Sequence, residues 1–174
     1  MGIVSTSATL NQMHSKGKEL VDALKKELEA QGHKASGRLY RSIRYKVEKR
    51  GKTISLKLFM AGYGWDVNNG QPPRDIPVSV IETWVRRKKI AVGKEIKKAA
   101  WAIKKTIAVE GTPTKGSFRF SSTGKRRGFV NIVLGRRRIS IKKSFKQSFS
   151  VDMERTFRKL ARDIDAKNPN LKRI

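Results

Sequence analysis

The sequence predicts an α+β fold in which an antiparallel β-sheet made of hairpins packs with three to four α-helices, with a basic β-hairpin arm in addition. Two patterns support this fold class. Some segments repeat apolar residues every three or four positions, as amphipathic helices do, whereas others alternate apolar and polar residues, as half-buried strands do. Hydrophobic residues form 37% of the 174 residues, which is enough for a packed core although 32% of the chain is charged.

The first helix is expected over residues 8–31. Leu20, Leu24 and Leu28 belong to an apolar stripe with helical spacing, and lysines and glutamates lie between its members. Gly32 follows the stripe, and glycine is the residue that most often ends a helix. The pattern predicts that one face of this helix packs on the core.

A β-hairpin is expected next. Apolar and polar residues alternate over residues 39–47 and again over 54–60, and the turn between them falls at 49–52. Residues 62–77 then lack periodicity but contain three glycines, two adjacent asparagines and three prolines, which all favour turns. We expect a shaped loop in that segment.

Two further helices are expected after this loop. Pro77 stands where a helix can begin, and the helix that follows it ends in the basic run 86–89. The second helix has its apolar stripe over residues 96–107 and stops at Gly111.

The next stretch differs in character, because residues 111–151 carry eleven lysines and arginines and no acid. Within it, residues 129–134 and 138–141 are rich in β-branched side chains and are separated by Gly135 and two arginines, which predicts a second hairpin. A C-terminal helix is expected over about residues 149–168.

The length of the chain fits one domain with an appended arm. The predicted parts are an α+β core over residues 1–120, a basic hairpin arm or insertion over 121–148, and a C-terminal helix over 149–174 that completes the core.

The net charge indicates an anionic partner. The chain has 41 lysines and arginines against 14 acids, a formal charge of +27, which is far more than solubility requires. Nucleic acid and an acidic protein surface both meet this requirement, and composition leaves the two open. The chain has no run of about 18 apolar residues and no signal peptide pattern, so we expect a protein without membrane association that is made in a cytoplasm.

The residues do not predict catalysis. There is no cysteine, no phosphate-cradling glycine motif and no acid spaced with a histidine or a second acid as a metal site or carboxylate pair requires. His14 and His33 are expected at the surface, at the two ends of the first helix. Asp66 beside Trp65 could act as a carboxylate in an aromatic pocket, but we favour a hydrogen bond to its own loop backbone. We expect neither enzymatic activity nor a cofactor.

Four short patterns occur in order between the first helix and residue 118. They are a Gly-x-Leu-x-x-Ser-Ile segment, an aromatic segment with valine, glycine and prolines, an Ile-x-x-Trp-Val helix with a basic end, and an alanine-rich helix followed by Gly-Thr-Pro. The matching residues are Gly37, Leu39, Ser42 and Ile43; Tyr63, Trp65, Val67, Gly70, Pro72 and Pro73; Ile81, Trp84, Val85, Arg87, Lys88 and Ile90; and Ala99, Ala102, Ile103, Ile107, Gly111, Thr112, Pro113 and Phe118. Together they resemble the head–tail connector (neck and tail-completion) proteins of tailed double-stranded DNA bacteriophages.

This resemblance covers roughly residues 8–120; the acid-free stretch is not part of the family pattern, and Lys89 stands where the family often has glycine. It implies a structural virion protein that forms a ring, a hexamer or a dodecamer, in the neck or tail region. Such a ring joins or seals the head to the tail and leaves a channel for the genome. The implied partners are portal, adaptor or tail proteins, with genomic double-stranded DNA in the channel as a further candidate.

Two groups of residues are candidate contact sites. The residues predicted to meet a partner or DNA from the basic hairpin are Lys125, Arg126, Arg127, Arg136, Arg137, Arg138, Lys142 and Lys143. The residues predicted to form an inter-subunit loop are Tyr63, Trp65, Asp66, Asn68, Asn69, Gly70, Pro72 and Pro73. We favour an acidic protein over DNA for the hairpin, because its apolar residues gain nothing from phosphates.

The sequence is also compatible with two other binding functions. A sequence-nonspecific nucleic-acid-binding protein, such as an RNA chaperone or a nucleoid protein, also suits the charge, although such proteins usually place exposed aromatics among the cations. A ribosome-associated protein is a further alternative.

Overall fold

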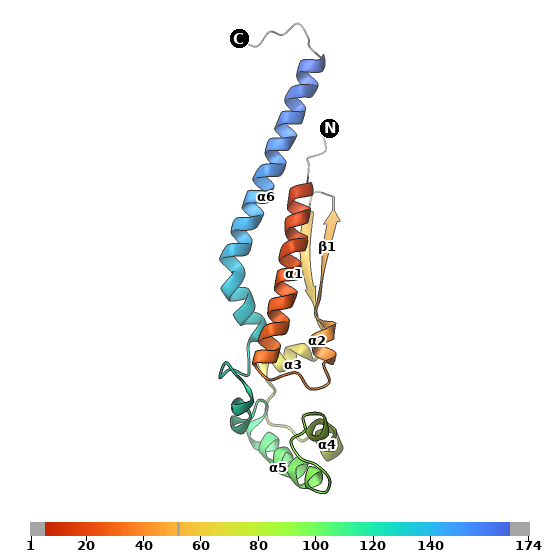
Figure 1. The fold of residues 1–174 in the computed structure, drawn as a ribbon, viewed down its shortest axis with the longest axis vertical. Helices are drawn as coiled ribbons and strands as arrows, with labels where there is room; N and C mark the ends of the chain where they lie inside the picture. The colour runs from red at the N-terminus through yellow and green to blue at the C-terminus, as the bar shows by residue number, and fades with distance from the viewer. Residues whose placement is uncertain (1–5, 52, 168–174) are drawn as a thin grey trace. The chain divides into compact units, whose positions relative to one another are not determined.

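The structure is a computed structural model that describes residues 6–51 and 53–167. Six α-helices, one 3-10 helix and two strands occur in this part of the chain (Figure 1). In order they are α1 (Ser7–Ala30), α2 (Arg38–Ser42), β1 (Arg44–Arg50), β2 (Thr53–Phe59), α3 (Gly64–Asn69), α4 (Val78–Arg87), α5 (Glu95–Glu110), the 3-10 helix η1 (Lys115–Phe120) and α6 (Phe129–Lys167). Strands β1 and β2 pair as one antiparallel hairpin, so the predicted α+β class is confirmed, with more helices than expected.

The chain forms two compact units, each built from segments that are distant in the sequence. Among the described residues, unit 1 comprises 6–19, 45–57 without residue 52, and 136–167. Unit 2 comprises residues 20–44 and 58–135. This division differs from the predicted core, arm and C-terminal helix, because each unit combines early and late parts of the chain.

Helix α1 has the predicted extent to within one residue at each end. Its apolar stripe is buried in unit 2, where Leu24 and Leu28 are almost fully covered. The helix ends as expected at Gly32, whose φ of 71° is left-handed. The Gly32 N–H donates to the Glu29 carbonyl and the His33 N–H to the Leu28 carbonyl, which is the Schellman arrangement that satisfies final carbonyls.

In unit 1 the hairpin packs on α1 through a glycine. A Cβ atom added to Gly17 would lie 2.4 Å from Cδ2 of Tyr45, so only glycine lets the β1 aromatic ring approach the helix this closely. Tyr45 also meets the His14 ring edge-on, with the ring centroids 5.9 Å apart. His14 is therefore in a contact between two elements of unit 1.

The first strand is shorter than predicted. Alternation was expected from Leu39, but residues 38–42 form α2 and β1 begins only at Arg44. Leu39 and Ile43 are both buried, and a spacing of four residues satisfies a helical turn as well as a strand. The Ser42 hydroxyl donates to the Leu39 carbonyl, which supports the helical conformation.

The segment predicted as a shaped loop contains a short helix, α3, over Gly64–Asn69. The two helices that follow are confirmed: α4 begins directly after Pro77, and α5 ends at Gly111, whose φ is 74°. These two helices pack on one another around a cluster of buried residues. Its members are Ile81, Val85, Ala100 and Ile107.

The prediction of a basic β-hairpin over residues 121–148 is wrong. Residues from Phe129 to Lys167 form one 39-residue helix, so the predicted C-terminal helix is only the second part of α6. Phe129, Val130 and Val133 are buried on one face of the first turns, because β-branched residues at helical spacing pack as well as they would in a strand. The predicted end near residue 168 lies outside the described residues.

Candidate functional site

The basic residues predicted to share one hairpin lie in different units. Lys125, Arg126 and Arg127 precede α6 in unit 2, whereas the cations from Arg136 to Lys143 lie on α6 in unit 1. Most of these side chains are exposed. Arg126 and Arg137 are the exceptions, and both have internal partners.

Arg137 is half-buried and forms an ion pair with Glu19 inside unit 1. Lys16 also pairs with this carboxylate, its Nζ lying 2.7 Å from Glu19 Oε2. The hydrogen bond from Lys16, followed by the charges of Lys16 and Arg137, lowers the pKa of Glu19 against the opposing effect of partial burial. Arg137 therefore connects α6 to α1 within unit 1, which the predicted exposed hairpin did not anticipate.

One side of α6 in unit 1 carries a stripe that changes from basic to apolar. The spacings of four and three residues place its members on one helix face. The stripe consists of Arg138, Lys142 and Lys146, followed by Phe149, Met153, Phe157, Leu160 and Ile164. Phe149, Phe157 and Ile164 are each more than half exposed, and no ion pair in the described part of the chain involves Arg138, Lys142 or Lys146. We call these eight residues the α6 stripe.

The predicted inter-subunit loop is mostly at the surface, with two exceptions. Trp65 is 53% exposed and Tyr63 40% exposed, and Asp66, Asn69, Pro72 and Pro73 are exposed as well. Asp66 accepts a hydrogen bond from the Gln71 side chain, so it is held within its own loop, by an amide side chain in place of the expected backbone.

Asn68 is buried in unit 2 and does not fit a role in subunit contact, whereas Gly70 is half-buried. Asn68 is 2% exposed, and its side-chain oxygen accepts the Val130 N–H at 2.9 Å. Its carbonyl accepts the Gly128 N–H at 2.7 Å, so this residue fixes the start of α6. Gly70 has a φ of 81°, and an added Cβ would lie 2.4 Å from the Thr112 carbonyl oxygen.

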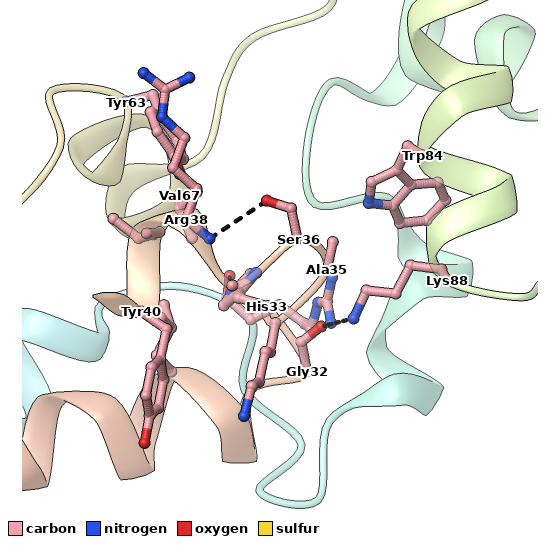
Figure 2. Close-up of a pocket in the computed structure, with 15 residues that line it drawn as sticks. Gly32, His33, Ala35, Ser36, Arg38, Tyr40, Tyr63, Val67, Trp84 and Lys88 are labelled. Carbon is pink, nitrogen blue, oxygen red and sulfur yellow. Dashed lines mark hydrogen bonds between the residues drawn. The ribbon is translucent and has the colours of Figure 1, made fainter. Parts of the chain in front are cut away.

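A pocket lies at the C-terminal end of α1 in unit 2, with a volume of about 230 Å³ (Figure 2). Its charged lining residues and its histidine are all basic, and no aspartate or glutamate is among the described residues that line it. The basic residues are His33, Lys34, Arg38, Lys88 and Arg126. Tyr40, Tyr63 and Trp84 add aromatic surface.

Two of these cations bind consecutive carbonyls at the end of α1. Lys88 Nζ donates to the Gly32 carbonyl at 2.7 Å, as Figure 2 shows, and Arg126 Nη1 donates to the Gln31 carbonyl at 2.7 Å. The last carbonyls of a helix lack intrahelical partners and carry the negative end of the helix dipole. Residues from two distant segments thus cap α1.

Burial and the Arg126 charge disfavour the protonated forms of the basic groups in this pocket. Burial lowers the pKa of Arg126, and burial followed by the Arg126 charge lowers that of Lys88. Burial, then the Arg126 charge, lowers the pKa of His33 to about 4, although its ring Nε2–H donates to the Arg126 carbonyl at 3.2 Å. At neutral pH His33 is uncharged, and its Nδ1 carries no proton.

Two buried polar atoms near the pocket lack a hydrogen-bond partner among the described residues. They are Nε of Arg126, a side chain that is only 8% exposed, and Oε1 of Gln31, which is fully buried. The Gln31 amide nitrogen is satisfied by Glu27 and the Arg127 carbonyl. A buried donor without a partner normally costs a protein free energy, so the Arg126 Nε–H needs an acceptor.

Sequence reasoning did not find this pocket. His33 was expected at the surface, Lys88 was one member of a basic run, and Arg126 was expected in an exposed hairpin. Only the Gly32 helix end, which sequence does indicate, marks the place where the three side chains meet. The described residues contain no group of three metal-ligating side chains, and none of their helices has the length and apolarity to cross a membrane. Comparisons with family models, with curated proteins and with solved structures gave no match.

Proposed function

We propose that this chain is a structural virion protein of a tailed phage, which forms a ring in the neck and joins or seals the head to the tail. In this function α6 docks on an acidic protein ring of the portal or the tail. The four-part sequence pattern over residues 37–118 supports the family, and the α6 stripe supports the mode of contact.

The observation that carries the proposal is the composition of the α6 stripe. Large apolar side chains such as Phe157, which is 61% exposed, normally need a covering surface when several lie together on one face. Arg138, Lys142 and Lys146 extend the same face with positive charge. A partner must therefore offer an apolar groove that continues into an acidic surface.

An acidic protein fits this stripe better than nucleic acid does. Phosphates reward cations, but the apolar half would remain uncovered on a duplex. Proteins that bind single strands place aromatic rings among their cations, whereas Phe149 and Phe157 lie beyond the basic half. Complementary charge also speeds docking and rejects wrong partners.

The exposed loop residues support contact between copies of the chain. Trp65 lies in α3 and Tyr63 directly precedes this helix, and both side chains are exposed. Amphipathic aromatics are common in the contact cores of interfaces. A ring needs two different faces on each subunit, so this loop and α6 can serve different neighbours.

The test reverses the charge of the basic half of the stripe with R138E, K142E and K146E together. Arg137 is left intact because it pairs with Glu19. We expect the triple variant to fold with a stability change within about 0.5 kcal/mol per site, but to be missing from assembled particles and to leave heads unjoined. Mass spectrometry and imaging of purified particles measure both outcomes.

The matched control reverses three exposed lysines at α5 with K94E, K97E and K105E, which changes the net charge equally. We expect particles with this variant to assemble normally. Intact infectious particles containing the α6 triple variant would refute the docking role. Steeply salt-dependent binding of the unaltered chain to free duplex DNA, lost in both variants, would favour the nucleic-acid-binding alternative.

A further inference from the structure

We infer that the pocket at the C-terminal end of α1 binds a phosphate group between the Arg126 guanidinium and the Lys88 ammonium. This inference concerns unit 2 alone and does not depend on the proposed place of the chain in a phage neck.

Both cations have donors left after they cap α1. Arg126 uses Nη1 on the Gln31 carbonyl, while its buried Nε–H has no acceptor among the described residues. Lys88 gives one of its three N–H groups to the Gly32 carbonyl. Both side chains line the same pocket, and the Arg126 charge acts on Lys88. Capping explains one bond from each side chain and leaves the Arg126 Nε–H unexplained.

The charge balance of the pocket requires an anion. Lys34, Arg38, Lys88 and Arg126 line it, and the described lining residues include no carboxylate. Lys34 has an acidic partner in Glu29, but this pair is exposed. Buried cations normally either pair with an anion or have a lowered pKa, which favours their neutral form. The pKa values of Lys88 and Arg126 are both lowered when no anion is bound.

Phosphate fits this site better than a carboxylate does. A phosphate dianion has more acceptor oxygens and more charge than a carboxylate, and arginine and lysine are its usual ligands in proteins. The Ser36 hydroxyl, which accepts the Arg38 N–H at 3.3 Å, still has a proton to donate. A volume of about 230 Å³ accommodates a phosphate, since one water takes about 30 Å³ of the liquid.

The chain packs tightly around Gly32 at the edge of the pocket. An added Cβ would lie 2.7 Å from Arg126 Nη1 and 2.3 Å from the Phe120 carbonyl oxygen, so Gly32 permits the guanidinium to reach the helix end. The Gln31 side chain is fully buried beside it. Arg126 is thereby fixed before any ligand arrives, which reduces the entropy lost on binding.

The experiment titrates the full chain with inorganic phosphate and with acetate at constant ionic strength, by calorimetry and by NMR of the histidine rings. We expect phosphate to bind and acetate to bind much more weakly. K88Q should weaken phosphate binding about tenfold or more, because a charge-assisted hydrogen bond is lost. R87Q, an equal charge change at the neighbouring exposed residue that does not line the pocket, should leave binding unchanged.

The two histidines provide an independent readout. An anion beside His33 favours its protonated form, so phosphate or sulfate should raise the pKa of His33 from about 4. The ring resonances of His14 in unit 1 should not move when the anion is added at constant pH. The charges that act on His33 are those of Arg126 and Lys88, which are both cationic, whereas the Glu29 carboxylate is paired with Lys34. An anion bound between Arg126 and Lys88 therefore adds negative charge where His33 has only cationic influences. Sulfate remains a dianion over the pH range in which His33 titrates, so the change observed with sulfate comes from the histidine and not from the ligand.

Any of three results would overturn the inference. They are an unchanged His33 titration with saturating sulfate and phosphate, equal affinities for acetate and phosphate, or equal losses of phosphate affinity in K88Q and R87Q. If K88Q does not fold, the His33 titration of the unaltered chain decides. Thymidine 5′-monophosphate in place of inorganic phosphate identifies the source: tighter binding indicates a phosphate ester, with the aromatic rings taking the organic part, and equal binding indicates free phosphate.

Discussion

The basic stretch around the start of α6 contains two regions that use the same residue types in opposite ways. Before Gly135, Arg126 is 8% exposed and Phe129 is completely buried in unit 2. Beyond Gly135, Arg138 is exposed and Phe157 is 61% exposed in unit 1. Charge composition alone therefore does not indicate which cations are available to a partner. A buried cation must find carbonyl or anionic partners, whereas an exposed one remains available to another molecule.

The largest expected effect tests the buried side of this comparison. F129A removes the largest fully buried side chain and should lower the free energy of unfolding by about 3–5 kcal/mol. F157A, on the same helix but exposed, should change it by no more than about 0.5 kcal/mol. Denaturant unfolding of both variants measures the contrast. Equal losses would show that the α6 stripe is covered within the chain.

The next effect concerns the half-buried His33 and is expected as a dependence of stability on pH. The pKa of His33 is lowered from 6.5 to about 4, mainly by burial and then by the Arg126 charge. As pH falls through this window the unfolded chain binds a proton that the folded chain refuses, so stability is lost with acidification. We expect a loss of up to about 3 kcal/mol, complete near the folded pKa.

H33Q keeps a side-chain N–H for the Arg126 carbonyl and should remove this component, and unfolding curves measured in phosphate-free buffer give the comparison. Glu48 titrates at lower pH, because hydrogen bonds from Lys57, then Lys46, lower its pKa from 4.5 to about 2. A slope between 6.5 and 4 that persists in H33Q would assign the titration to another group.

The smallest expected effect is on stability and concerns Asp152, a buried residue in the part of α6 that belongs to unit 1. Asp152 is 1% exposed and accepts the Ala8 N–H at 3.0 Å and the Thr9 N–H at 2.8 Å, which are among the first donors of α1 without intrahelical partners. D152A should therefore cost about 2 kcal/mol of unfolding free energy. D163A, at an exposed acid of the same helix, is the control and should have almost no effect.

Much of the fold could be predicted from sequence because local patterns carry it. The apolar stripe and Gly32 define α1, Pro77 and Gly111 bound α4 and α5, and alternation predicts the hairpin. The prediction was wrong where a pattern fits two structures. Leu39 and Ile43 satisfy a strand and a helical turn equally, and the β-branched residues after Gly128 suit a buried helix face as well as a strand.

The candidate sites could be predicted only in part. The exposed cations and the exposed loop aromatics follow from composition and turn chemistry. The sequence does not indicate the burial of Asn68, because its role depends on the backbone N–H of Val130, sixty-two positions away. The same applies to the meeting of Lys88 and Arg126 at the end of α1.

Local sequence patterns are sufficient to predict the α+β class, the surplus of positive charge and the ends of α1, α4 and α5, because these depend on neighbours within a few positions. Tertiary packing determines that one 39-residue helix replaces the basic hairpin, and that Arg126 is buried whereas Arg138 is exposed. Burial depends on which distant segments pack together, and the free energy of that packing overrides local preference.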